Sequence, residues 1–317
     1  MNILVTGGCG FIGSNIVEHI LENNTFKLVR VIDNLSTGNK NNIKHLLDKY
    51  NNLEYIYADI TDLEICRKVM VNIDLICHQA AIGSVPRSIK NPLYSHNNNV
   101  NGFFNILLAA NENNIKRIVY ASSSSVYGDE PILPKVENKT GNLLSPYAAT
   151  KAINEIYGSI FTKCYNMEII GLRYFNVFGP RQDPNGPYAA VIPKFINLIK
   201  QNKQPVINGD GSYSRDFTYV ENVIQANILA LTTTNKKCFG SVFNIGAKGR
   251  ITILELFNEL KKQLKFNKNP IFGNKRDGDI PHSNADISKA QNLLNYNPKI
   301  DFDIGIKKLL EYNGLQI

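Results

Sequence analysis

The feature that most restricts the fold of this chain is a glycine cluster near its start. The cluster lies between a strand-like and a helix-like segment. Residues 2–6 form a short apolar run, and residues 11–21 carry apolar side chains at helical spacing. Gly7, Gly10 and Gly13 stand at GxxGxxG spacing at the junction. Such a turn lets a pyrophosphate approach the helix N-terminus, where free N–H groups and the helix dipole favour anions. The cluster predicts a dinucleotide site, with a purely structural turn as the alternative.

An acidic residue closes the second predicted strand, 28–33. Asp33 follows Gly13 at the distance of about 20 residues that is typical of dinucleotide-binding units. Its carboxylate can accept hydrogen bonds from a ribose 2′-hydroxyl and would repel a 2′-phosphate. NAD is therefore predicted over NADP. The residues expected to form this part of the site are Gly7, Gly10, Phe11, Ile12, Gly13 and Asp33.

Apolar strands alternate with helices through the first half of the chain. Further strands are expected at 53–57, 74–77, 117–121 and 169–174, and helices at 100–112 and 147–164. Continuous apolar strands between helices indicate a parallel sheet covered on both faces. We therefore predict an α/β fold with a doubly wound parallel sheet of the Rossmann type.

The pattern changes after residue 176, where prolines and glycines interrupt the chain. Short helices are expected at 189–200, 253–264 and 304–312. We predict a dinucleotide-binding domain at 1–175 and a smaller, mixed substrate-binding domain at 176–317. The segment at about 217–245 is a candidate to return to the first domain.

Charge and cysteine usage narrow the class of protein. Lys and Arg number 35 against 27 Asp and Glu, a net charge of +8, yet the basic residues are spread without a cluster typical of nucleic-acid binding. The 5 cysteines have no metal-ligand spacing, which favours a reduced interior without a metal site. No apolar run approaches the roughly 20 residues of a membrane helix. A strand beginning at residue 2 leaves no room for a targeting peptide. We expect a cytoplasmic protein that binds neither nucleic acid nor membrane.

A tyrosine and a lysine open the predicted helix 147–164. Tyr147 and Lys151 are four residues apart and therefore share a helix face. An ammonium group there would stabilise tyrosinate and lower the tyrosine pKa, so that the phenol could act as an acid and base near neutrality. Four serines, 122–125, end the preceding strand at the sheet edge where α/β proteins bind ligands. The combination predicts a catalytic site rather than a surface Tyr/Lys pair and a flexible turn.

Longer stretches carry a resemblance to a known family. The glycine motif, the serine run, Ser-Pro-Tyr-Ala-Ala-Thr-Lys at 145–151 and Leu-Arg-Tyr-Phe-Asn at 172–176 resemble the extended short-chain dehydrogenase/reductase family. Other segments are similar to UDP-sugar 4-epimerases, and most similar to those that act on UDP-N-acetylglucosamine. These segments are 79–88, 176–186, 207–211, 214–217 and 278–283.

The resemblance implies a reaction. Tyr147 would take the proton of the sugar 4′-hydroxyl while hydride passes to NAD, and the 4-keto sugar would turn and be reduced on its other face. Lys151 would hold the nicotinamide ribose, and Ser123 or Ser124 would bond the reacting oxygen. UDP-N-acetylglucosamine and UDP-N-acetylgalactosamine would be interconverted, with UDP-glucose and UDP-galactose as a further pair. A homodimer is implied through the helices at 100–112 and 147–164.

The resemblance also assigns contacts residue by residue. The remaining cofactor positions are Asn34, Ser36, Gly38, Asp59, Ile60, Gln79, Ala80, Ala81, Asn98, Tyr147, Lys151 and Tyr174. The substrate positions are Gly83, Ser84, Ser123, Ser124, Tyr147, Asn176, Asn208, Arg215, Arg276, Asp279 and Ser283. Relatives restricted to plain hexoses have a tyrosine at the position of Ser283, where serine would leave room for an acetamido group.

Related enzymes with other activities carry different residues at the positions that matter for their reactions. Related dehydratases carry an Asp-Glu pair, and related decarboxylases a glutamate, where this chain has Ser-Ser-Val-Tyr at 124–127. A non-catalytic NAD sensor would be expected to lose Tyr147 and Lys151, which are present. Within the epimerases, UDP-N-acetylglucosaminuronate remains an alternative substrate.

Overall fold

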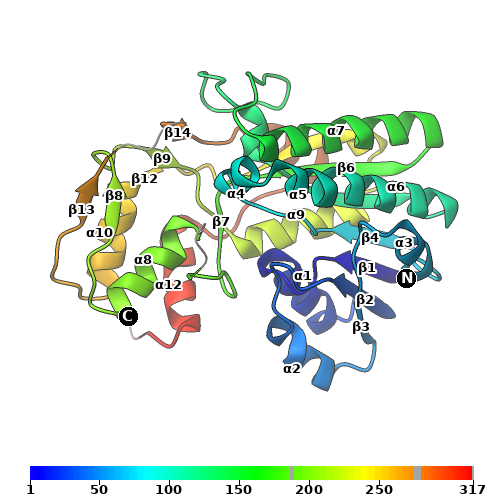
Figure 1. Cartoon of the computed structure of the whole chain (residues 1–317), viewed down its shortest axis with the longest axis horizontal. Coiled ribbons are helices and arrows are strands. Elements are labelled where there is room, and N and C mark those ends of the chain that lie inside the picture. The colour runs from blue at the N-terminus through cyan, green and yellow to red at the C-terminus, as the bar shows by residue number, and fades with distance from the viewer. Residues whose placement is uncertain (186–188, 275–279, 316–317) are drawn as a thin grey trace.

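Seven parallel strands form the central layer of the computed structural model, which describes residues 1–185, 189–274 and 280–315 (Figure 1). They are β1 (Asn2–Thr6), β2 (Leu28–Asp33), β3 (Leu53–Tyr57), β4 (Leu75–His78), β5 (Arg117–Ser123), β6 (Glu168–Tyr174) and β11 (Ser241–Ile245). Their order is β11-β6-β5-β4-β1-β2-β3, and every neighbouring pair is parallel. The predicted doubly wound sheet is confirmed.

Helices cover both faces of this sheet. One face carries α1 (Phe11–Glu22), α2 (Asn41–Lys49), α9 (Val220–Thr232) and α11 (Ser288–Leu294). The other carries α3 (Leu63–Val69), α6 (Gly102–Glu112) and α7 (Pro146–Tyr165). Successive strand residues point to opposite faces, so Val5 joins the first apolar cluster and Leu4 the second. The continuous apolar runs in the sequence are explained by this double burial.

Short helical pieces stand at the carboxyl ends of β4 and β5. After β4 come α4 (Val85–Lys90), α5 (Pro92–His96) and a π-helical turn, Asn97–Asn101, that leads into α6. The helix expected at 100–112 therefore begins at Gly102. The serine run is divided, since Ser122 and Ser123 end β5 while Ser124 starts a 3₁₀ turn, Ser124–Tyr127. Both regions border the sheet edge where ligands bind in such folds.

The C-terminal part forms a smaller unit beside the sheet, on the left in Figure 1. Its strands are β7 (Val177–Phe178), β8 (Val206–Asn208), β9 (Ser214–Arg215), β10 (Thr218–Tyr219), β12 (Ile251–Thr252), β13 (Ile271–Gly273) and β14 (His282–Ser283). Its helices are α8 (Val191–Lys200), α10 (Ile253–Gln263) and α12 (Phe302–Tyr312). A separate apolar cluster, which includes Phe195 and Leu256, fills the space between these helices.

The segment 217–245 contributes to the large sheet. Helix α9 packs against it, and β11 pairs with β6 in register from Ser241 opposite Ile170 to Ile245 opposite Tyr174. The chain thus leaves the sheet after β6 and comes back to complete its edge. The division into domains at 175 and 176 stays a prediction.

Candidate active site and cofactor site

The glycine turn between β1 and α1 brings a helix N-terminus directly to the sheet edge. Gly7 has a φ of +68°, and a Cβ added there would lie 2.7 Å from the backbone of Ala80. A Cβ on Gly13 would lie 2.2 Å from the carbonyl oxygen of Gly7. Helix α1 has no side-chain cap at Gly10 and no acidic residue in its first turn. Its first N–H groups can therefore bind an anion such as a pyrophosphate.

Asp33 faces this turn from the end of β2. Its Oδ2 accepts a hydrogen bond from the Cys9 N–H at 2.9 Å, and its Oδ1 accepts one from the Leu35 N–H at 2.8 Å. A Cβ on Gly38 would lie 2.9 Å from Asp33 Oδ2. Burial raises the pKa of Asp33, and the two backbone bonds oppose that rise. Each oxygen keeps a lone pair that can accept from a ribose hydroxyl.

Predicted cofactor residues form a strip along the ends of β2 and β3. Asn34 Nδ2 donates to Asp59 Oδ2 at 2.8 Å, and the Ser36 N–H donates to Asn34 Oδ1 at 3.0 Å. Burial acts to raise the pKa of Asp59, but bonds from Thr61 and Asn34 outweigh it and leave the pKa below its usual value. Ile60 packs against Gly102, where a Cβ would lie 2.7 Å from its side chain.

Beyond β4, the loop that holds Ala80 and Ala81 is fixed by buried polar groups. The Thr6 hydroxyl accepts from the Ala80 N–H at 3.2 Å and lies 2.8 Å from His78 Nδ1. Burial and the charge of Lys151 lower the pKa of His78 to about 3, so this imidazole is neutral. Thr6 is a positioning residue that the sequence analysis missed, although its place directly before the glycine turn was a usable signal.

Asn99, the neighbour of the predicted cofactor residue Asn98, holds the next part of this loop. Asn99 is buried, accepts from the Ile82 N–H at 2.7 Å and donates to Thr150 Oγ1 on α7 at 3.1 Å. Asn98 Nδ2 instead donates to the carbonyl of Tyr94 at 2.9 Å. Neighbouring asparagines at 97–101 offered no sequence signal to separate the two.

The loop then reaches the start of α4. Ser84 caps α4 by accepting from the Arg87 N–H at 3.2 Å, and it has a φ of +101°, which is strained for a side-chain-bearing residue. A Cβ on Gly83 would meet nothing within 4 Å. Of the predicted substrate residues here, Gly83 thus borders open space, while the Ser84 hydroxyl is engaged in the helix cap.

Tyr147 is fixed at the first turn of α7. Ser145 caps this helix by accepting from the Ala148 N–H at 3.1 Å, and Pro146 occupies its first position. The Tyr147 N–H donates to the Ser88 hydroxyl of α4 at 3.0 Å. Ser88 is fully buried and was not identified from the sequence. The backbone beneath the phenol is therefore held from two sides.

The electrostatics of the Tyr147/Lys151 pair differ from the sequence expectation. Burial raises the pKa of Tyr147, and the interaction with the Ser123 side chain opposes that rise. Lys151 is buried, and its ammonium donates to the Ala121 carbonyl at 2.7 Å. Burial lowers the pKa of Lys151 to about 8, against the attraction of Glu155. The expected lowering of the tyrosine pKa by Lys151 is not found in the chain alone, where Ser123 opposes the rise that burial causes.

Strand alternation divides the serine run. The Ser122 hydroxyl donates to Glu155 Oε1 at 2.5 Å, while the Ser123 hydroxyl accepts from the Ser125 N–H at 3.2 Å and faces Tyr147. Ser124 starts the 3₁₀ turn. Of the two candidate serines, the structure brings Ser123 to the phenol.

A buried ion pair supports α7 from the sheet. Arg173 on β6 donates to both oxygens of Glu155, from Nε at 2.9 Å and from Nη2 at 2.7 Å. Their side chains are 5% and 13% exposed. Glu155 lies one helical turn beyond Lys151. Neither member was identified from the sequence as part of the site.

A further predicted cofactor pair, Gln79 and Tyr174, meets a third side chain. Tyr174 Oη lies 3.1 Å from Gln79 Oε1 and 2.8 Å from Asn227 Nδ2. Gln79 Nε2 donates to Asn227 Oδ1 at 3.1 Å. Asn227 is fully buried on α9. Helix α9 also carries Glu221, Asn222 and Gln225, so no sequence signal singled out Asn227.

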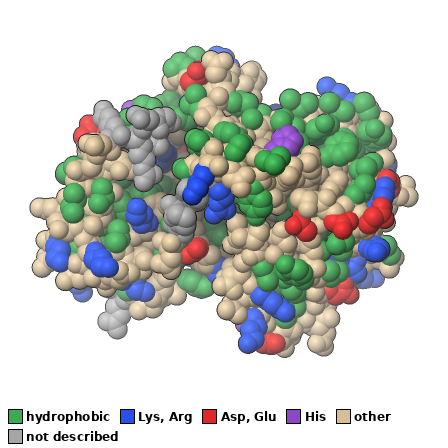
Figure 2. Space-filling view, viewed as in Figure 1, with side chains coloured by type: hydrophobic (Ala, Val, Ile, Leu, Met, Phe, Trp, Pro, Cys, Tyr) green, Lys and Arg blue, Asp and Glu red, His purple; other side chains and the backbone are tan. Residues whose placement is uncertain are grey.

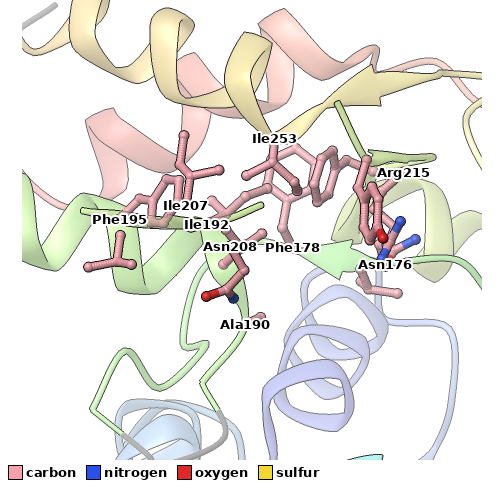
Figure 3. Close-up of a pocket in the computed structure, with 14 residues that line it drawn as sticks. Asn176, Phe178, Ala190, Ile192, Phe195, Ile207, Asn208, Arg215 and Ile253 are labelled. Atoms are coloured by element: carbon pink, nitrogen blue, oxygen red, sulfur yellow. The ribbon is translucent and has the colours of Figure 1, made fainter. Parts of the chain in front are cut away.

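A pocket of about 270 Å³ lies in the C-terminal part (Figure 3). Three predicted substrate residues line it, namely Asn176, Asn208 and Arg215. Figure 3 shows Arg215 and Asn176 together at one end and Phe195 at the other. Apolar residues complete the lining, among them Phe178, Ile192, Ile207 and Ile253. The pocket can accept a flat ring between apolar walls with a guanidinium group at one end.

Ser283 lies beside this pocket. Strand β14 pairs with β9 so that Ser283 is opposite Arg215. Asp216, which directly follows β9, is fully buried and accepts from the N–H groups of Ala247 at 2.9 Å and Ala285 at 3.2 Å. It thereby connects β9 to the chain segments around Ala247 and Ala285. The predicted substrate residues Arg276 and Asp279 lie outside the described residues. Within the described ranges, no group of three or more His, Cys, Asp or Glu side chains could hold a metal ion.

The length and apolar character of the helices decide whether any of them could cross a membrane. In residues 1–185, 189–274 and 280–315, no helix has both the length and the apolar character needed to cross a bilayer.

Comparison with solved structures gives close neighbours. The UDP-N-acetylglucosamine 4-epimerase of Methanobrevibacter ruminantium, solved with UDP-N-acetylmuramic acid, has a TM-score of 0.92 and 39% identity over 98% of this chain and 97% of its own. The UDP-glucose 4-epimerase of Thermotoga maritima, solved with UDP-glucose, has a TM-score of 0.92 and 34% identity over 99% of both chains. The UDP-glucuronic acid 4-epimerase of Bacillus cereus, solved with UDP-glucuronic acid and NAD, has a TM-score of 0.90 and 32% identity over 98% of both.

A family model agrees with these neighbours. The model of the NAD dependent epimerase/dehydratase family matches residues 3–246, which include the glycine turn, Asp33, the Tyr147/Lys151 pair and β11. The predicted cofactor, NAD, is confirmed. The chain belongs to the NAD dependent epimerase/dehydratase family.

Proposed function

We propose that this chain is a UDP-sugar 4-epimerase that interconverts UDP-N-acetylglucosamine and UDP-N-acetylgalactosamine. One observation carries the proposal: Ser123 faces the Tyr147 side chain, and Lys151 donates to Ala121 on the same strand, at the sheet edge that also bears the uncapped N-terminus of α1. The pocket with Asn176 and Arg215 supports it by offering a place for the nucleotide.

The chain's own residues perform the proton chemistry. Tyr147 takes the proton of the sugar 4′-hydroxyl and later returns it, while Ser123 bonds the same oxygen. NAD supplies the hydride acceptor and donor at C4′. Lys151 brings a positive charge near the phenol, which favours tyrosinate at the moment of proton transfer. To accept that proton Tyr147 must first be ionised, and because its pKa is raised in the folded chain, it depends on the positive charge of Lys151 to reach the tyrosinate form.

The NAD-binding residues are proposed from the strip of groups along the sheet edge. Gly7, Gly10 and Gly13 admit the pyrophosphate, and Asp33 accepts from a ribose. The further proposed positions are Phe11, Ile12, Asn34, Ser36, Gly38, Asp59, Ile60, Gln79, Ala80, Ala81, Asn98, Tyr147, Lys151 and Tyr174. The proposed substrate positions are Gly83, Ser84, Ser123, Ser124, Tyr147, Asn176, Asn208, Arg215, Arg276, Asp279 and Ser283.

The reaction is tested with purified protein and separate UDP-sugars. We expect UDP-N-acetylglucosamine to give UDP-N-acetylgalactosamine without added NAD, with the products separated by anion-exchange chromatography and identified by proton NMR. UDP-N-acetylglucosaminuronate, UDP-glucose and UDP-glucuronate are run in parallel. Absence of 4-epimerisation of every UDP-sugar would contradict the proposal, and a strong preference for a uronate would replace the substrate.

Ser283 supports the N-acetylated substrate, because it lies opposite the pocket residue Arg215 and is smaller than the tyrosine found there in relatives restricted to plain hexoses. Ser283→Tyr should lower kcat/KM for UDP-N-acetylglucosamine about 10- to 100-fold more than for UDP-glucose, since overpacking costs about 1–3 kcal/mol. Ser283→Thr serves as a matched control with little added volume. Equal losses on both substrates would remove the physical support for the N-acetyl assignment.

We also propose a homodimer formed through α6 and α7. Hydrophobic side chains gather over this region at the upper right of Figure 2. Ile156 and Ile160 on α7 are 59% and 42% exposed, whereas Phe103 on α6 is fully buried. Phe104 packs on Tyr157 within the chain. Light scattering should give twice the chain mass, and Ile156→Glu should yield monomers; a wild-type monomer at micromolar concentration would contradict the dimer.

A further inference from the structure

Asn227, Gln79 and Tyr174 form a closed ring of hydrogen bonds whose direction can be derived. Asn227 Nδ2 lies 2.8 Å from the Val223 carbonyl, which can only accept, so this atom of the amide must be the nitrogen. The same nitrogen donates to Tyr174 Oη at 2.8 Å. Asn227 Oδ1 is then the acceptor for Gln79 Nε2 at 3.1 Å.

The tyrosine proton completes the ring. Tyr174 Oη has two neighbouring acceptors, Asn227 Oδ1 at 3.2 Å and Gln79 Oε1 at 3.1 Å. Asn227 Oδ1 already accepts a hydrogen bond from Gln79. Among the described residues, no other N–H or O–H group donates to Gln79 Oε1. The single phenolic proton therefore goes to Gln79 Oε1, and every member donates to the next.

The ring determines what Gln79 and Tyr174 can offer a ligand. The second proton of Gln79 Nε2 points to Cys77 Sγ at 3.4 Å, so neither residue retains a free donor. Both keep lone pairs. Asn227 and Tyr174 are buried, while Gln79 is partly exposed and is the member able to meet a ligand.

We propose that Asn227 is a positioning residue of the NAD site, which together with Tyr174 fixes Gln79 as a pure hydrogen-bond acceptor toward the cofactor. The inference rests on the assignment of Gln79 and Tyr174 to that site in the proposed function. Without Asn227, the Gln79 amide can turn and the Tyr174 proton can leave its partner, so the acceptor is no longer fixed before NAD binds.

A matched control lies on the same helix. Asn222 is also buried on α9 and makes three bonds of similar quality, to the Ile300 carbonyl at 2.6 Å and from the N–H groups of Lys299 at 2.9 Å and Ile300 at 3.1 Å. Its partners belong to the C-terminal segment and not to the sheet edge. Asn222→Leu and Asn227→Leu therefore remove equivalent buried amides, and only Asn227→Leu opens the ring.

The experiment measures exchange of bound NAD against isotopically labelled NAD by mass spectrometry, well below the melting temperature of each variant. Asn227→Leu should exchange NAD at least about tenfold faster than wild type, equivalent to ~1.4 kcal/mol. Asn222→Leu should lose thermal stability and keep the wild-type exchange rate. Tyr174→Phe should also accelerate exchange, and its effect should not multiply with that of Asn227→Leu, because both open one ring.

The outcomes are distinguishable. Equal exchange in Asn227→Leu and Asn222→Leu overturns the inference and leaves the proposed function standing. If Asn227→Leu does not fold, Tyr174→Phe with a wild-type exchange rate overturns it equally. A wild-type protein that carries no NAD and epimerises no UDP-sugar contradicts the proposed function itself.

Discussion

Replacing Arg173 with methionine should be among the most destabilising single changes in the large sheet. The substitution removes the cation from a pair whose side chains are 5% and 13% exposed. Glu155 accepts three hydrogen bonds, one from Ser122 Oγ and two from Arg173, at Nε and Nη2. In the variant it would keep only the bond from Ser122. Leaving such a charge unpaired costs about 3–5 kcal/mol. That is a large fraction of the roughly 5–15 kcal/mol by which proteins are stable.

Urea unfolding followed by circular dichroism measures this cost. Glu155→Leu should destabilise by a similar amount, while the double variant Arg173→Met/Glu155→Leu should lose less than the two costs added, because neither charge remains. Lys308→Met is the control, since its pair with Glu221 is 39% and 44% exposed and is expected to contribute about 0–1 kcal/mol. A loss below about 1 kcal/mol in Arg173→Met, or fully additive costs in the double variant, would refute the reasoning.

Tyr147→Phe should lower kcat by about 10²–10⁴ and keep NAD bound, as shown by nucleotide released on denaturation; a rate near wild type would mean that another group moves the proton. Ser123→Ala should lower kcat, whereas Ser122→Ala, whose hydroxyl serves Glu155, should mainly lower stability, and steady-state rates with melting curves separate the two. The pKa of Lys151 is lowered from 10.5 to about 8, so the folded state binds fewer protons than the unfolded state between these values. The free energy of unfolding of the wild type should therefore rise from pH 8 to 10.5 relative to that of Lys151→Met, as urea titrations would show. If the two proteins changed with pH in the same way, the burial of this charge would be contradicted.

The parts predicted from the sequence are those encoded by short-range patterns. The glycine turn, Asp33 at a strand end and the Tyr147/Lys151 spacing each depend on residues close in the chain, and each fell at the sheet edge. Continuous apolar strands were recognisable because each is buried on both sides. The pairing of Gln79 with Asn227 had no such signal, since 148 residues separate them.

Register explains other details that the sequence left open. Ser122 and Ser123 differ by one position, and only the pleat of β5 sends one to Glu155 and the other toward Tyr147. The role of Asn99 was not found because it stands in a run of asparagines within a π-helical turn that has no apolar period. The spacing of Tyr147 and Lys151 also said nothing about how far the folded chain shields the phenol from water, which is what raises the pKa of Tyr147.

The late return of β11 to the edge of β6 has a consequence for synthesis on the ribosome. Strand β6 ends at Tyr174, and β11 is complete about 70 residues later, at Ile245. At about 5–20 residues per second, the nascent sheet presents an unpaired, largely apolar edge for roughly 4–14 s. During that interval the edge can pair with another chain instead. Slow codons between these strands would lengthen the exposure, so the yield of folded protein should depend on translation speed in this stretch.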